Sequence, residues 1–145
     1  MKLWVILSQA ICIAMLCGCA AFPKESTSST SGAVAADAIS PKLANANRRE
    51  LDQSRVVLSG LLVYDGYSYG IWGSVGAFES GRIEECVTPL ATGKISRELY
   101  SRSGEFVVLE GTFVSNYTRK EIVVSGGCNF SGLRVLSVWS LVASD

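Results

Sequence analysis

Hydrophobic residues divide this chain into three zones. A nearly continuous apolar run extends from Leu3 to Leu16. A polar zone rich in Ser, Thr, Ala and Asn follows, over residues 20–53. From Arg55 onward, short runs of Val, Leu, Tyr, Trp and Phe alternate with Gly, Ser, Asn and Asp. The three zones predict an N-terminal targeting segment, a linker and one small folded domain.

The last zone has the pattern of a mostly β domain. Runs of β-branched and aromatic residues predict strands, and apolar residues at helical spacing predict one short helix. The expected strands cover residues 56–64, 71–79, 84–88, 106–114, 121–125 and 133–142, and the expected helix covers residues 92–101. We expect Pro89 to interrupt the chain after the third strand. In the linker, Ser40 and Pro41 form a cap and first-turn pair that predicts a second helix.

The predicted strands are apolar on both faces. In the first of them Leu61 lies on one face and Leu62 on the other. A closed barrel whose outside is partly covered by helix and loops would bury both faces. Mid-strand glycines would allow the bending that closure needs; they are Gly60, Gly73, Gly76 and Gly111.

The order of three strands, a helix and further strands is similar to that of the OB fold. This fold is a five-stranded barrel whose helix lies between strands three and four. The resemblance implies a small OB-like β-barrel over residues 55–142, closed or partly open, with one short helix. A small sandwich or another β-roll is the alternative.

The apolar run ends in Leu16-Cys17-Gly18-Cys19. The run is roughly 14 residues long, too short to span a bilayer, and it has the build of a secretory signal. The four residues resemble the lipobox of bacterial lipoprotein precursors, in which a small residue precedes the cysteine that receives lipid. The resemblance implies that residues 1–18 are removed as a signal peptide and that Cys19 is lipidated. An ordinary secretory signal or a short membrane anchor is the alternative.

Lipidation at Cys19 would determine where the protein is located and how the chain divides into signal peptide, tether and domain. Two acyl chains already anchor a protein stably in a membrane, and processed lipoproteins usually carry three. In this family an aspartate directly after the lipidated cysteine commonly retains the protein in the inner membrane, whereas this chain has Ala20. The resemblance therefore implies the periplasmic face of the outer membrane. We expect a signal peptide over residues 1–18, a lipidated tether with a short helix over 19–53, and the OB-like domain over 54–145.

Five cysteines are present in the whole chain, and two remain for the folded domain. Cys12 and Cys17 would leave with the signal, and Cys19 would carry lipid. In an oxidising compartment the remaining Cys86 and Cys128 predict one disulfide. Two buried free thiols are the alternative. Two thiols in a chain without histidine argue against a metal site.

Charge and catalytic chemistry exclude several functions. Without Lys2 the chain carries twelve Lys and Arg against thirteen Asp and Glu, scattered along the sequence. No basic patch of the kind that binds nucleic acid is therefore expected. The absence of histidine removes the Ser-His and Cys-His pairs of common hydrolases. The adjacent Glu84 and Glu85 would point to opposite faces of a strand. We expect no catalytic site and no cofactor.

Aromatic residues gather around the first predicted turn and offer a binding surface. Tyr67, Tyr69 and Trp72 suit stacking on sugars or packing against a protein. In the alternative, Trp72 and Tyr64 belong to the barrel and only the turn tyrosines are exposed. The sequence thus predicts a non-enzymatic binding module for an envelope protein or glycan. The second hypothesis is an inhibitor or immunity-type protein that blocks a periplasmic hydrolase with a loop such as Asn116–Gly132.

Overall fold

The computed structural model of the 145-residue chain describes residues 37–117, 128 and 131–141. Its strands within these residues are β1 (Arg55–Tyr64), β2 (Tyr69–Trp72), β3 (Cys86–Leu90), β4 (Phe106–Val114) and β5 (Gly132–Ser140). Its helices there are α2 (Pro41–Ala46), α3 (Val75–Glu79) and α4 (Gly93–Ser101), with a 3-10 turn η1 (Ile83–Glu85). The described part of the chain is therefore mostly β, as the hydrophobic pattern predicts.

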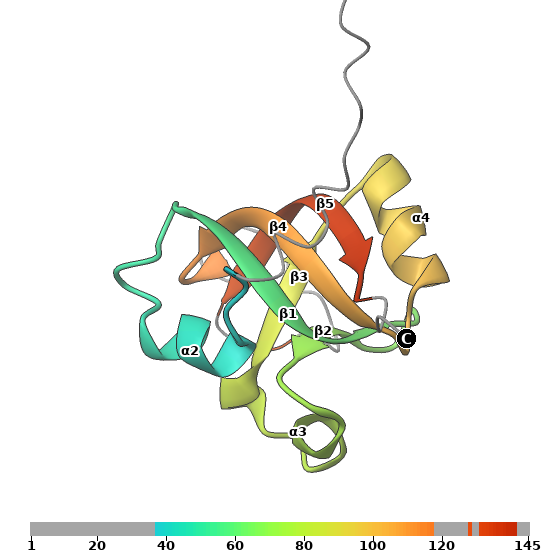
Figure 1. The fold of residues 1–145 in the computed structure, drawn as a ribbon, viewed down its shortest axis with the longest axis horizontal. Helices are drawn as coiled ribbons and strands as arrows, with labels where there is room; N and C mark the ends of the chain where they lie inside the picture. Colours follow the sequence, from blue (N-terminus) through green and yellow to red (C-terminus); the bar gives the residue numbers. More distant parts are fainter. Residues whose placement is uncertain (1–36, 118–127, 129–130, 142–145) are drawn as a thin grey trace, which may run out of the picture.

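The five strands form a closed barrel in the order β1-β2-β3-β5-β4, in which β4 returns to pair with β1 (Figure 1). Neighbouring strands are antiparallel except β3 and β5, which are parallel. Helix α4 lies between β3 and β4 in the chain. This arrangement confirms the expected OB-like barrel and excludes the sandwich.

The barrel explains why its strands are apolar on both faces. Leu58 and Leu62 of β1 point inward and join the main core. Leu61 and Val63 point outward, where they form a second cluster with residues of β2, α3 and the disulfide. In Figure 1, α2 and α4 lie on opposite sides of the barrel. Each helix contributes a fully buried residue to the main core, Ala44 from α2 and Leu99 from α4.

Two of the four predicted bending glycines lie where neighbouring strands approach too closely for a side chain. Gly60 lies near the point where β1 stops pairing with β4 and starts pairing with β2. A Cβ there would overlap the backbone carbonyl of Trp72. Gly111 adjoins an irregularity in the β4–β5 register, and a Cβ there would overlap the backbone carbonyl of Arg134. At both positions only a hydrogen fits.

The predicted second strand over residues 71–79 is wrong beyond Trp72, where β2 ends. The side chain of Ser74 accepts a hydrogen bond from the backbone N–H of Ala77 at 3.0 Å and caps α3. Because serine at this position satisfies an unpaired N–H of the first helical turn, it favours a helix start over a continuing strand. Gly73 and Gly76 therefore lie in a turn and in α3 rather than in a strand.

The third strand begins and ends later than expected, and Pro89 lies inside it. The expected range was 84–88, whereas β3 covers Cys86–Leu90. The backbone N–H of Thr88 donates to the carbonyl of Ser131 on the β5 side. Successive N–H groups of a strand point to opposite sides, so the missing N–H of Pro89 falls on the β2 side. The β2–β3 pairing ends at Val87, so proline costs no ladder bond there.

The remaining strands and α4 lie close to their predicted ranges. β1 and β4 match residues 56–64 and 106–114 within one residue. β5 covers residues 132–140 against the expected 133–142, and α4 covers 93–101 against 92–101. The predicted strand over residues 121–125 lies outside the described residues.

The polypeptide before β1 packs on the barrel. Ser40 and Pro41 begin α2 as expected, and the side chain of Ser40 accepts from the backbone N–H of Leu43 at 3.2 Å. Ile39 pairs in parallel with Leu58, along the edge of β1 that the short β2 leaves open. Residues 39–51 thus lie on the tether side of the predicted boundary at residue 54 but contribute side chains to the packed unit.

Candidate functional site

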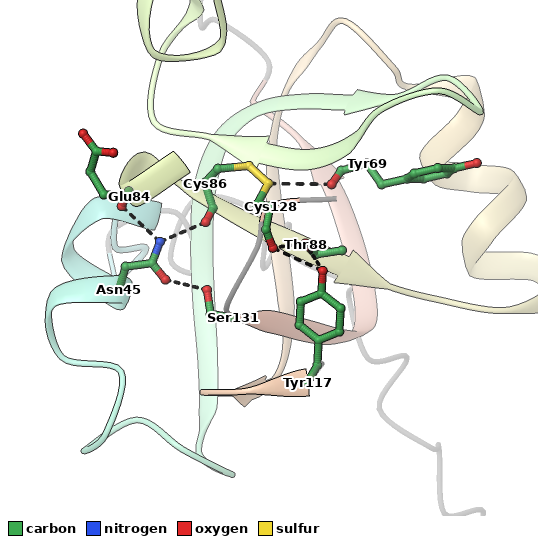
Figure 2. Close-up of a disulfide and its surroundings, with 8 residues drawn as sticks. All are labelled: Asn45, Tyr69, Glu84, Cys86, Thr88, Tyr117, Cys128 and Ser131. Carbon is green, nitrogen blue, oxygen red and sulfur yellow. Dashed lines mark hydrogen bonds between the residues drawn. A yellow bond between two sulfur atoms is a disulfide. The ribbon is translucent and has the colours of Figure 1, made fainter. Parts of the chain in front are cut away.

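The predicted disulfide is present and joins the start of β3 to the β4–β5 connection. Cys86 and Cys128 are bonded, with their Cα atoms 5.5 Å apart and both side chains buried. Figure 2 shows the pair on the barrel wall, with the sulfur of Cys128 at 3.7 Å from the backbone carbonyl of Tyr69. The disulfide therefore fastens Cys128 to β3, and the sulfur of Cys128 also contacts the first residue of β2.

Hydrogen bonds around Cys128 strengthen this attachment. The hydroxyls of Thr88 and Tyr117 both donate to the backbone carbonyl of Cys128, at 2.8 and 3.2 Å (Figure 2). All three residues are buried. Tyr117 and Cys128, which flank residues 118–127, are thus both held against β3.

The outer face of β2 and β3, which often binds ligands in OB folds, is covered in this protein. Trp72 is only 8% exposed and packs edge-to-face on Phe78 of α3, with ring centroids 5.4 Å apart. The prediction that Trp72 belongs to an exposed binding surface is therefore wrong. The cause is α3, which turns back over the outer face directly after β2 ends.

The space between Trp72 and the disulfide is kept free by a glycine. A Cβ at Gly70 would lie 2.6 Å from the indole nitrogen of Trp72 and 2.7 Å from each sulfur of the disulfide. Within residues 37–117, 128 and 131–141, this indole nitrogen is the one buried side-chain nitrogen or oxygen without a hydrogen-bond partner. The close packing of Trp72 and the disulfide beside Gly70 thus leaves the indole N–H of Trp72 without an acceptor.

The turn between β1 and β2 presents an exposed aromatic residue. We call residues Asp65–Tyr69 the tyrosine turn. Its central residue Tyr67 is 87% exposed. The carboxylate of Asp65 accepts hydrogen bonds from the backbone N–H groups of Tyr67 and Ser68 at 2.9 and 2.8 Å. The bond from Ser68, followed by the bond from Tyr67, lowers the pKa of Asp65 below its ordinary value, because both bonds favour the ionised carboxylate.

Three aromatic rings, those of Tyr64, Tyr69 and Tyr100, pack together beside the tyrosine turn. Tyr64 meets Tyr69 and Tyr100 edge-to-face, with centroids 4.8 and 5.0 Å apart. The hydroxyls of Tyr69 and Tyr100 lie 3.4 Å apart, and this contact, with burial second, raises the pKa of Tyr69 to about 12. Tyr69 therefore stays protonated at neutral pH. It can donate a hydrogen bond, but it is unsuited to act as a base.

The structure brings together part of the predicted surface and excludes the rest. Tyr67 is exposed, Tyr69 is half-buried and Trp72 is covered. Tyr100 of α4, which the sequence did not indicate, is 46% exposed and packs beside Tyr69. The helix brings it there from 31 residues away in the chain, and no local sequence signal marks that contact.

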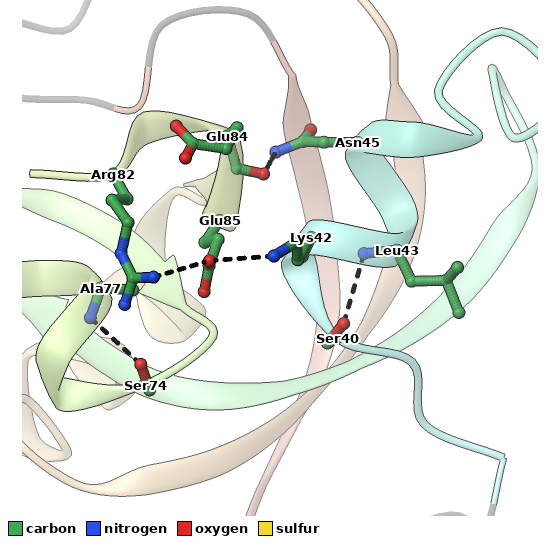
Figure 3. Close-up of polar contacts among 9 residues, drawn as sticks. All are labelled: Ser40, Lys42, Leu43, Asn45, Ser74, Ala77, Arg82, Glu84 and Glu85. Atoms are coloured by element: carbon green, nitrogen blue, oxygen red, sulfur yellow. Dashed lines mark hydrogen bonds and ion pairs between the residues drawn. The ribbon is translucent and has the colours of Figure 1, made fainter.

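A groove between α2 and η1 also escaped the sequence-based prediction. Its volume is about 540 Å³, and its wall includes Lys42, Asn45, Ile83, Cys86 and Ser131. The amide nitrogen of Asn45 donates to the backbone carbonyls of Glu84 and Cys86 at 3.0 and 2.9 Å (Figure 3 shows the first). Its amide oxygen accepts from the hydroxyl of Ser131. Both ends of this amide are engaged within the chain, so Asn45 holds α2 in place.

The two adjacent carboxylates have different roles. Glu84 is exposed, whereas Glu85 is buried and one of its oxygens lies 3.3 Å from both Lys42 and Arg82 (Figure 3). The two side chains are thus separated as expected, although on η1 rather than on a strand, and Glu85 forms salt bridges with Lys42 and Arg82. Among the described residues, no group of three or more His, Cys, Asp or Glu side chains is placed to hold a metal ion.

Replacing Asn45 with alanine is expected to lower the free energy of unfolding by about 2 kcal/mol. The variant loses three hydrogen bonds that tie α2 to η1, to the start of β3 and to Ser131 just before β5, each worth about 0.5–1.5 kcal/mol. The matched control is Asn47→Ala, which loses one exposed bond to the carbonyl of Leu43 and should change stability by less than about 0.5 kcal/mol. Equal losses in urea denaturation of the two variants would contradict this role.

Comparisons with protein-family models, with curated proteins and with solved structures find no match to this chain. The class of the protein is therefore defined by its fold, a disulfide-braced OB-like barrel with a covered β2–β3 face and an exposed tyrosine turn. No helix in the described ranges combines the length and the apolar character needed to cross a membrane.

Proposed function

We propose that this chain is a bacterial lipoprotein that presents its barrel at the periplasmic face of the outer membrane as a non-enzymatic binding module. Two observations support this location: the lipobox-like Leu16-Cys17-Gly18-Cys19 and the Cys86–Cys128 disulfide. Structural disulfides persist mainly in oxidising compartments, of which the bacterial periplasm is one. Residues 39–51 of the polar zone pack on the barrel, so the proposed tether is the part before them, residues 20–38.

One observation carries the proposal of binding, namely the exposure of Tyr67 on a turn that is held by its own hydrogen bonds. An aromatic side chain that is 87% exposed gains apolar burial only when a partner covers it. The turn is already ordered by Asp65, so little conformational entropy is lost on binding. An envelope protein or a glycan is the proposed partner, and the lack of histidine in the chain supports a role without catalysis.

Metabolic labelling with palmitate tests the anchor. The full-length chain should incorporate label, and Cys19→Ser should abolish incorporation because the thiol is the acceptor. Cys17→Ser is the control, since a serine two residues before the lipidated position should still permit processing. Labelled Cys19→Ser protein, or an unlabelled wild-type chain, would contradict the proposed lipidation.

Capture from detergent-solubilised membranes separates binding from inhibition. The second candidate, an inhibitor of a periplasmic hydrolase, is favoured by the disulfide, because a small disulfide-braced domain is well suited to such a role. An inhibitor should recover a stoichiometric hydrolase and abolish its activity. A binding module should recover a partner whose activity, if it has one, is unchanged.

A further inference from the structure

We infer that the tyrosine turn inserts Tyr67 into a pocket on a folded protein, so that the partner is a protein rather than a glycan. This inference rests on the proposed binding function and assigns the partner of the same surface. It follows from how Tyr67 is held and from the orientation of the rings around it.

The tyrosine turn is fixed before any partner arrives. Besides the two hydrogen bonds to the Asp65 carboxylate, the backbone N–H of Asp65 donates to the carbonyl of Ser68 at 3.3 Å. Gly66 has φ +93°, a conformation that favours glycine, and the hydroxyl of Tyr100 lies against it. A rigid turn that exposes one tyrosine has the features of an interface hot spot, since tyrosine is enriched there and the backbone that carries it is already ordered.

The neighbouring rings do not form a platform for sugar. Tyr64 is buried, and it meets Tyr69 and Tyr100 with interplanar angles of 83° and 87°, so the rings meet edge to face. Tyr69 is itself half-buried. Among these rings only Tyr67 is largely exposed, so a sugar would stack on one ring of a projecting turn, whereas small-ligand sites are generally concave. The projecting Tyr67 instead suits a pocket on the partner, with an apolar wall for its ring and a hydrogen-bonding group for its hydroxyl.

Site-specific crosslinking in cells tests the partner's class. A photo-crosslinking amino acid at position 68 of the full chain leaves Tyr67 in place, and the same group at position 79, exposed on α3, is the control. The expected result is a discrete, protease-sensitive adduct from position 68 that is lost with Tyr67→Ala and not formed from position 79. An adduct that cell-wall hydrolases remove, or Tyr67-dependent binding to purified peptidoglycan, would overturn the inference while leaving the binding function in place.

Affinity for the crosslinked protein, once purified, tests the insertion itself. Tyr67→Ala should weaken binding by about 30-fold or more, the loss typical of a hot spot. Asp65→Ala should weaken it by about 10-fold although Tyr67 is retained, because the turn loses its two acceptor bonds, whereas Asp65→Asn keeps a side-chain oxygen in that position and should bind nearly as wild type. A partner bound equally well by Tyr67→Ala would overturn only this inference. Failure of the wild-type chain to bind any partner would overturn the proposed function as well.

Discussion

Removing the disulfide with Cys86→Ala and Cys128→Ala together is expected to lower the free energy of unfolding by about 4 kcal/mol. The bond closes a loop between residues 42 apart, and in the chain-entropy model a loop of this length restricts the unfolded state by about that amount. Alanine is chosen because both positions are buried and a serine hydroxyl would need a partner. Urea denaturation under oxidising conditions measures the difference.

Reductant provides the control for this prediction. The wild-type chain should lose most of the same stability when it is unfolded in the presence of a thiol reductant, whereas the double variant should be unaffected. A part of the loss should come from packing, because both sulfurs fill the space beside Gly70 and Trp72. A double variant within about 1 kcal/mol of wild type would show that the described contacts hold the β4–β5 connection without the bond.

Gly60→Ala is expected to lower the free energy of unfolding by about 3 kcal/mol, the upper part of the range for overpacked positions. The added Cβ would overlap the backbone carbonyl oxygen of Trp72, and a main-chain atom cannot move away by changing rotamer. Relief requires that β1 and β2 separate near the position where β1 changes partners. We expect this variant to show a lower midpoint in thermal and urea denaturation.

Gly76→Ala is the matched control for the barrel glycine. Gly76 lies within α3, and a Cβ there would meet only a side-chain nitrogen of Arg82, at an ordinary 3.8 Å. Because alanine is favoured over glycine inside a helix by about 1 kcal/mol, this variant should be neutral or slightly more stable. If the two substitutions had equal effects, close strand approach would not be the reason for glycine at position 60.

Some elements were predictable because their signals are local. β1 and β4 are apolar runs of nine or ten residues that are rich in valine and contain a glycine, and this composition favours a strand over a buried helix. α4 shows helical spacing, and Ser40 with Pro41 is a local start signal for α2. The disulfide followed from counting cysteines, which needs no knowledge of the fold.

Other features could not be predicted because they depend on distant neighbours. α3 is an exception: its start signal, the cap at Ser74, is local, but Val75 and Phe78 are as compatible with a strand as with a helix. Pro89 is tolerated because the pairing of β2 with β3 ends at Val87, which no pattern around the proline reveals. Of the candidate site, Tyr67 was predictable from its place in a turn, whereas Tyr100 joins it only through the packing of α4.

By itself the sequence determined the β character of the domain, the OB-like order of strands and helix, and the cysteine pair, because composition, spacing and counting are properties of the chain alone. Only the tertiary structure decided that Trp72 is covered while Tyr67 is exposed, that α2 packs on the barrel, and that Asn45 ties it to η1. The physical reason is that exposure and hydrogen bonding depend on which distant segments share a surface, and closing the barrel brings those segments together.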